Sequence, residues 1–129
     1  MGKPGYTGLK RILHAAYYSY LGFRAAWKHE SAFRQKTVLA LLMLPLAVWL
    51  GHNALEIAVL LATLFLVMIV ELLNSGIEAV VDRIGDEPHK LSVRAKDMGS
   101  AAVFLSLMLV LVVWGTITVS LFFPELIPY

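Results

Sequence analysis

The sequence predicts an all-α membrane protein with three transmembrane helices and one N-terminal helix on the membrane surface. Hydrophobic residues make up 59% of its 129 residues and charged residues only 16%, a balance outside the range that is usual for soluble domains. Three apolar segments are long enough to be spans, and an N-terminal segment combines an apolar face with a basic face. We expect one membrane domain, residues 1–129.

The N-terminal segment, residues 6–30, is predicted to be an amphipathic surface helix. Its apolar residues recur at the spacing of one helical face: Leu9, Ile12, Leu13, Ala16, Tyr20, Phe23 and Trp27. The other face is basic, which suits contact with anionic headgroups: Lys10, Arg11, His14, Arg24 and Lys28. A plain membrane anchor would have the same pattern, since nothing in this helix alone argues for catalysis.

Three spans are predicted, roughly Thr37 to Leu50, Leu55 to Val81 and Ala101 to Phe123. They belong to longer segments at 31–50, 55–83 and 93–123, with a loop at 84–92 and a tail at 124–129. In the first span, Pro45 removes one backbone hydrogen bond, and we expect a kink there. All eleven Lys and Arg residues lie either before Thr37 or between the second and third spans. Because basic residues are retained on the cytoplasmic side, the N-terminus and the 84–92 loop should be cytoplasmic and the tail should be outside.

Several functional classes are disfavoured by what the sequence lacks. Cysteine is absent, which excludes disulfides and thiolate chemistry, and the four histidines do not have the spacing of zinc ligands. No secretory signal is expected, because no continuous apolar stretch precedes a cleavage site near the N-terminus. The three tryptophans, Trp27, Trp49 and Trp114, are interpreted as residues of the interfacial belt.

Polar residues in the second span are the most informative feature of the sequence, because a charged side chain there costs about 2.5 to 3.5 kcal/mol. They share one helical face: Glu71, Asn74, Ser75, Glu78 and Asp82. At about 1.5 Å per residue, Glu71 lies about 24 Å and Glu78 about 35 Å from the outer end, against an apolar core of about 30 Å. We expect neighbouring subunits to cover the Glu71 face, since one small subunit buries little surface.

The connection after the second span mixes acidic and basic groups, as a metal-nucleotide site requires. Its charged or titratable residues are Asp86, Glu87, His89, Lys90, Arg94, Lys96 and Asp97. Phosphoryl transfer needs oxygen ligands for magnesium, cations for the phosphates and a group that orients or deprotonates the attacking hydroxyl. The phosphate-binding motifs GxxxxGK[ST] and GxGxxG are absent, and so are the protein-kinase signatures.

Three motifs carry a resemblance to a known family: ELLNSGIEAVVDRI at residues 71–84, RAKDMGSAA at 94–102 and RAAWKHESAFRQ at 24–35. Together they resemble the bacterial integral-membrane diacylglycerol kinases, over most of the chain from about Tyr6 to the third span. The resemblance implies a homotrimer in the bacterial cytoplasmic (inner) membrane that uses Mg-ATP to convert diacylglycerol to phosphatidic acid. It also implies active sites shared between subunits near the cytoplasmic boundary.

The resemblance implies a role for each matching position. Glu71 would be the catalytic base with Asn74 beside it, Glu30 and Glu78 would hold Mg²⁺, and Asp82 would support them. The nucleotide would contact Arg11, Tyr18, Glu30, Glu78, Glu87, His89, Lys96 and Asp97. The lipid substrate would contact Arg11, Ala15, Ser19, Tyr20, Phe33, Arg34, Gln35, Trp49, Glu71 and Ser100.

Two alternatives remain open beside the diacylglycerol kinase. An undecaprenol kinase would use the same chemistry, although we expect the residues after its second glutamate to differ from the Ala-Val-Val-Asp-Arg of positions 79–83. A small proton-coupled carrier or pore would instead use Glu71 and Glu78 as relay groups. Proton flux in vesicles without nucleotide would support this last interpretation.

Overall fold

The computed structural model describes residues 5–129 as four α-helices. They are α1 (Gly8–His29), α2 (Ser31–Leu50), α3 (Ala54–Ile84) and α4 (Lys90–Phe122). The last three are long and apolar enough to cross a membrane, which confirms the all-helical class and the three candidate spans. Helix bounds differ from the predicted ones by at most three residues, and the largest difference is the start of α4 at Lys90. Pro45 lies inside α2, which continues to Leu50.

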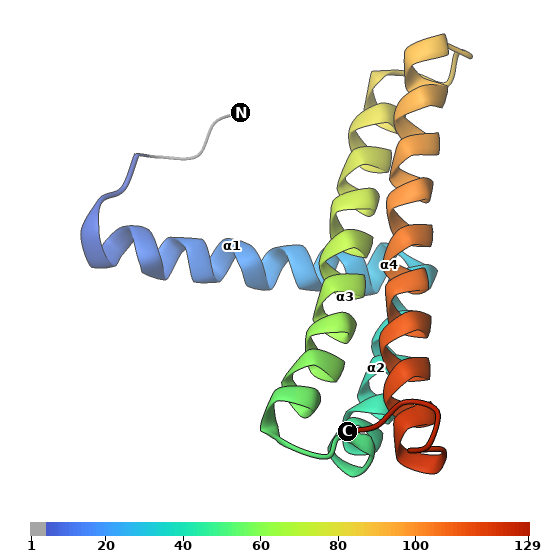
Figure 1. The fold of residues 1–129 in the computed structure, drawn as a ribbon. Coiled ribbons are helices and arrows are strands. Elements are labelled where there is room, and N and C mark those ends of the chain that lie inside the picture. Colours follow the sequence, from blue (N-terminus) through green and yellow to red (C-terminus); the bar gives the residue numbers. More distant parts are fainter. Residues whose placement is uncertain (1–4) are drawn as a thin grey trace.

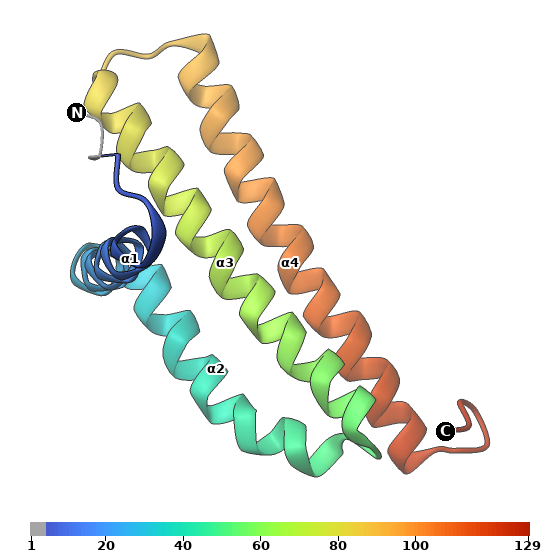
Figure 2. The same ribbon diagram turned by 90° about the vertical axis from the view of Figure 1, so that its left-hand side faces the viewer.

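An elbow at Glu30 joins α1 to α2. The extended backbone of Glu30, with φ −118° and ψ 104°, ends α1 and begins α2. The Arg34 guanidinium of α2 donates hydrogen bonds through Nη1 to the carbonyl oxygens of Trp27, at 2.7 Å, and Lys28, at 3.3 Å. These carbonyls have no partner within α1, so Arg34 stabilises the end of that helix. Consequently α1 runs across the other three helices (Figures 1 and 2).

Helices α3 and α4 lie side by side and extend well beyond the level of α1 (Figures 1 and 2). The 31 residues of α3 span about 46 Å and the 20 residues of α2 about 30 Å. Only α2 therefore matches the thickness of an apolar membrane core. Residues 80–97, which include the α3–α4 connection, form the end of this pair beyond α1, and we call them the projecting hairpin.

The packed core lies in the opposite half of the bundle, where α2, α3 and α4 meet. Its buried residues are Ala47, Leu50, Leu60, Leu64 and Trp114. The indole Nε1 of Trp114 donates a hydrogen bond of 2.9 Å to Thr63 Oγ1, whose hydroxyl donates to the Leu60 carbonyl at 2.7 Å. The prediction of an interfacial Trp114 is thus wrong, because Thr63 supplies inside the bundle the polar partner that this indole needs.

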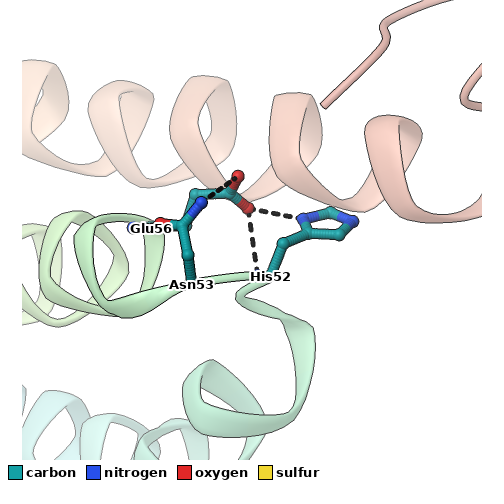
Figure 3. A network of polar contacts seen from close by, with 3 residues as sticks. All are labelled: His52, Asn53 and Glu56. Carbon is teal, nitrogen blue, oxygen red and sulfur yellow. Dashed lines mark hydrogen bonds and ion pairs between the residues drawn. The ribbon is translucent and has the colours of Figure 1, made fainter.

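Three residues fix the turn between α2 and α3 (Figure 3). Asn53 caps α3, its Oδ1 accepting a hydrogen bond of 3.0 Å from the Glu56 backbone N–H. The Glu56 carboxylate lies 2.5 Å from His52 Nδ1 and also accepts from the His52 backbone N–H at 3.2 Å. Tyr129 stacks on the His52 ring with centroids 4.1 Å apart, so the C-terminal tail folds back onto this turn.

Candidate functional site

Glu71 is enclosed within a single chain, with only 3% of its surface exposed. Its Oε2 lies 2.9 Å from Nζ of Lys36, and the two side chains are 4% and 22% exposed respectively. No hydrogen-bond donor in residues 5–129 is aligned with Oε2, so the contact is an ion pair without a directed hydrogen bond. The expectation that neighbouring subunits must cover this carboxylate is wrong, since the long Lys36 side chain reaches it from α2.

Asn74 of α3 packs directly against Gly99 of α4. Its Nδ2 donates a hydrogen bond of 3.3 Å to Glu78 Oε1, while its Oδ1 is buried and has no partner within residues 5–129. Across from it is Gly99 of α4, where an added Cβ would overlap Asn74 Oδ1 and lie 3.3 Å from Cγ. The absence of a side chain at Gly99 therefore provides the space in which the Asn74 amide faces Glu78.

Asp82 and Lys96 connect the two helices of the projecting hairpin. Nζ of Lys96 donates a hydrogen bond of 2.7 Å to Asp82 Oδ1, and both side chains are well exposed. Lys96 precedes the apolar residues that begin at Ala101, so it lies outside the spanning part of α4. The hydrogen bond to Asp82 raises the pKa of Lys96, with smaller contributions from the Asp82, Glu78 and Asp86 charges. Lys96 thus stays charged at neutral pH.

A cavity of about 570 Å³ separates the C-terminal half of α1 from α3, and Glu30 is on its wall. Small residues account for the space: Gly22, Ala25 and Ala26 on α1, and Ser75, Gly76 and Ala79 on α3. Ala79, the residue after Glu78, is also on the wall, but the Glu78 side chain does not line this cavity. Carboxylate oxygens are the ligands that Mg²⁺ prefers.

A second cavity, of about 700 Å³, shares Ser19 with the first. Four residues of the predicted nucleotide and lipid contacts line it: Arg11, Ala15, Tyr18 and Ser19. The segment before α1 forms another wall, where the Tyr6 ring stacks on His14 with centroids 3.9 Å apart. These predicted residues of α1 thus form one stripe that leads along the helix to Glu30.

Other predicted lipid contacts lie around the elbow. Tyr20 and Phe33 line a third cavity, of about 660 Å³, together with Arg24 and Lys28. Phe33 is 5% exposed, whereas Gln35 is on the surface. The Arg34 guanidinium is engaged by the end of α1, as described above. The elbow therefore combines aromatic surface with basic groups.

The remaining predicted residues lie apart from Glu71. Trp49 is at the far end of α2, where its ring centroid is 6.3 Å from that of Phe122. Glu87 and His89 lie in the loop of the projecting hairpin, and His89 Nδ1 accepts a hydrogen bond of 3.1 Å from the Leu91 N–H. Asp97 and Ser100 are exposed on α4. Within residues 5–129 no three His, Asp or Glu side chains are grouped as a metal site would need.

The sequence pattern does not reveal two residues of the site. Lys36 is one of the basic residues that orient the chain, but its pairing with Glu71 depends on how α2 is rotated against α3. Gly99 lies inside the RAKDMGSAA motif without a predicted role. A glycine within an otherwise helical pattern is a signal of close helix approach, and this signal was available.

The fold and the site define a class of protein: a helical membrane protein with three helices that could span a membrane and a buried carboxylate on the second of them. The family model of the prokaryotic diacylglycerol kinases matches residues 17–118, and the chain belongs to this family. The resemblance inferred from the three motifs is thereby confirmed.

Bacterial relatives agree with this family. The chain is 55% identical over 108 residues to the diacylglycerol kinase of Escherichia coli strain K12, which covers 84% of this chain and 88% of that protein. It is 52% identical over 113 residues to the diacylglycerol kinase of Pseudomonas aeruginosa, covering 88% and 92%. For the diacylglycerol kinase of Haemophilus influenzae the identity is 49% over 111 residues, covering 86% and 94%.

Proposed function

We propose that this chain is an ATP-dependent lipid kinase that phosphorylates diacylglycerol to phosphatidic acid at the cytoplasmic membrane boundary. The observation that carries the proposal is Glu71, a carboxylate 3% exposed within an apolar helix and in contact with Lys36 in the second turn of α2. A buried carboxylate at that depth can meet the hydroxyl of a membrane lipid, and a nucleotide can approach from the water. The relatives named diacylglycerol kinase support this substrate.

In the proposed reaction the lipid hydroxyl oxygen bonds to the γ-phosphorus of ATP and the bond to ADP breaks. Glu71 accepts the hydroxyl proton, and Asn74 orients the neighbouring carboxylate of Glu78 through its hydrogen bond. Oδ1 of Asn74 is buried and has no hydrogen-bond partner within residues 5–129. Correct positioning and charge stabilisation account for most of the catalysis in phosphoryl transfer.

A kinase family implies a nucleotide and a divalent metal ion, and we propose Mg²⁺ held by Glu30 and Glu78. Their oxygen atoms are suitable ligands, and the cavity beside Glu30 extends to the residue after Glu78. The ion, when bound, would offset the charge of the phosphates. Lys96, Asp97, Glu87 and His89 are proposed to contact the nucleotide from the projecting hairpin, and Arg11 and Tyr18 from α1.

The lipid is proposed to approach around the elbow between α1 and α2. Tyr20 and Phe33 line one cavity there, and Ala15 and Ser19 line another along α1. Arg34, Gln35, Trp49 and Ser100 belong to the proposed lipid path by family resemblance, with Asp82 in a supporting role. We propose the bacterial inner membrane as the location, with a cytoplasmic N-terminus and α1 on the membrane surface.

We also propose that the active enzyme is a homotrimer with sites shared between subunits. The projecting hairpin exposes large apolar side chains beyond the level of α1, where lipid tails do not reach: Val80, Ile84, Leu91 and Val93. The cavity that Arg11 lines on α1 has no residue of the projecting hairpin of the same chain in its wall. If the projecting hairpin of a neighbouring subunit packed over this cavity, it would bury its own apolar side chains and close the cavity. The number three rests on the resemblance, and crosslinking that gave only active monomer would contradict shared sites.

The decisive experiment is transfer of labelled γ-phosphate from Mg-ATP to short-chain diacylglycerol and to undecaprenol side by side. We expect turnover with diacylglycerol only, and a loss of about 10²- to 10⁴-fold in kcat for Glu71→Gln, which keeps the shape of the side chain but removes the base. Turnover confined to undecaprenol would favour the polyprenol kinase. No turnover from folded, oligomeric protein, combined with proton flux in vesicles, would favour the carrier.

A further inference from the structure

Lys36 has no assigned role, although it is the cation in contact with the proposed base. It lies in the second turn of α2, and its Nζ is 2.9 Å from Glu71 Oε2. Next to the pair is a small apolar cavity of about 60 Å³, walled by Leu39 of α2, Val67 of α3 and Leu107 of α4. The ion pair therefore borders apolar surroundings contributed by all three spans.

The apolar surroundings make the Lys36 ammonium the charge partner of Glu71. Burying a charged group away from water is costly unless the charge is paired. Lys36 therefore compensates the charge of the Glu71 carboxylate and also fixes where that carboxylate lies.

The contact also determines which oxygen of Glu71 is available. Oε2 has almost no exposed surface and faces the Lys36 ammonium. A substrate hydroxyl must then approach the other oxygen, Oε1. We infer that Lys36 is a positioning residue for phosphoryl transfer, which holds Glu71 as an oriented carboxylate and does not itself contact the substrates. This inference rests on the proposed role of Glu71 as the base.

The test compares Lys36→Met, which retains the length of the side chain without its charge, with Lys36→Arg, which retains the charge. We expect Lys36→Met to lower kcat by about 10- to 100-fold, with KM for ATP and for diacylglycerol within about threefold of the parent. Lys36→Arg should recover most of the loss. A control is Glu125→Gln, which removes an exposed charge on the C-terminal tail and should leave kcat unchanged.

A variant with Glu71→Gln and Lys36→Met together leaves no unpaired charge, so it tests folding apart from chemistry. Its oligomeric state and thermal unfolding should match the parent, and its kcat should equal that of Glu71→Gln alone, since both changes act through one group. An unchanged kcat in Lys36→Met, a rise in KM alone, or no recovery in Lys36→Arg would each overturn the role of Lys36. If Glu71→Gln itself remained active, the proposed base would fail instead.

Discussion

The buried polar groups in the two halves of α3 differ in whether they have hydrogen-bond partners. In the half near α2's C-terminus, Thr63 is buried but both donates to the Leu60 carbonyl and accepts from Trp114. In the half beside α1, Asn74 has a buried Oδ1 without a partner among residues 5–129, and Glu71 has an ion pair without a directed hydrogen bond. The cavity lined by Glu30 and Ser75 adjoins this second half.

The first half of α3 contributes to the packing of the helices, and the second half contributes to the proposed active site. Buried polar groups in native proteins normally have partners, and an unpartnered one calls for an explanation such as a bound ligand. The core around Trp114 follows the ordinary rule and fixes the positions of the helices. The polar face of Glu71 and Asn74 departs from that rule at the place where substrate and nucleotide are proposed to meet.

Among the variants that probe the two halves of α3, Gly99→Ala is expected to have the largest effect. A Cβ at Gly99 would overlap Asn74 Oδ1, so the amide must rotate away and Glu78 would lose its hydrogen bond. Misplacement of a positioning group by about 1 Å can cost about 10²-fold in rate, and we expect kcat to fall by about 10- to 100-fold. The measurement is steady-state kinase turnover together with thermal unfolding.

Gly115→Ala is the matched control for Gly99→Ala. Gly115 is on the same helix in the other half, and a Cβ there meets no atom within 4 Å. Because alanine is the better helix former by roughly 1 kcal/mol, this variant should be as stable as the parent or more so, with unchanged kcat. Equal losses of kcat in the two variants would mean that α4 tolerates no added methyl group, and the comparison would fail.

A smaller effect is expected from Trp114→Phe, which probes the other half. The variant removes the indole donor to Thr63 while Thr63 keeps its bond to the Leu60 carbonyl. Interhelical hydrogen bonds in membranes contribute about 0.6 kcal/mol on average and up to about 1.7 kcal/mol, so unfolding should become easier by that amount. Unfolding in detergent with turnover as the second readout tests this, and kcat should stay within twofold. Phe104→Leu, at an exposed position of α4, should change neither quantity.

The sequence was sufficient for the helices but not for their mutual rotation. Apolar runs and the breakers around Gly51 and Gly85 are local signals, so the four helices were predicted to within three residues at each end. The contact between Thr63 and Trp114 joins residues 51 positions apart, and the one between Lys36 and Glu71 joins two different helices. Such contacts depend on which faces meet, and a single sequence does not determine this.

The candidate site was predicted in a similarly uneven way. Glu71, Asn74 and Glu78 could be identified because charge and amide groups within an apolar helix are conspicuous. The cover over Glu71 was predicted wrongly, because surface area alone was considered and the reach of the Lys36 side chain was not. Gly99 was missed because its function is to provide space, which a residue-by-residue search for reactive groups does not detect.

The smallest effect is expected from Asp82→Asn in the projecting hairpin. The variant removes the partner of Lys96, but both side chains are largely exposed, and exposed ion pairs contribute little. The loss of stability should therefore be smaller than that of Trp114→Phe and should shrink as salt is added. The pKa of Lys96 is raised in the folded protein. The ion pair therefore contributes its full stability below the ordinary pKa of 10.5, and this stability is lost as pH rises through the higher pKa of the folded state. Between about pH 6 and 9 the difference from the parent should stay constant. Glu125→Gln, on the exposed tail, is the control, and a pH-dependent difference in that range would mean that another group near Asp82 titrates with it.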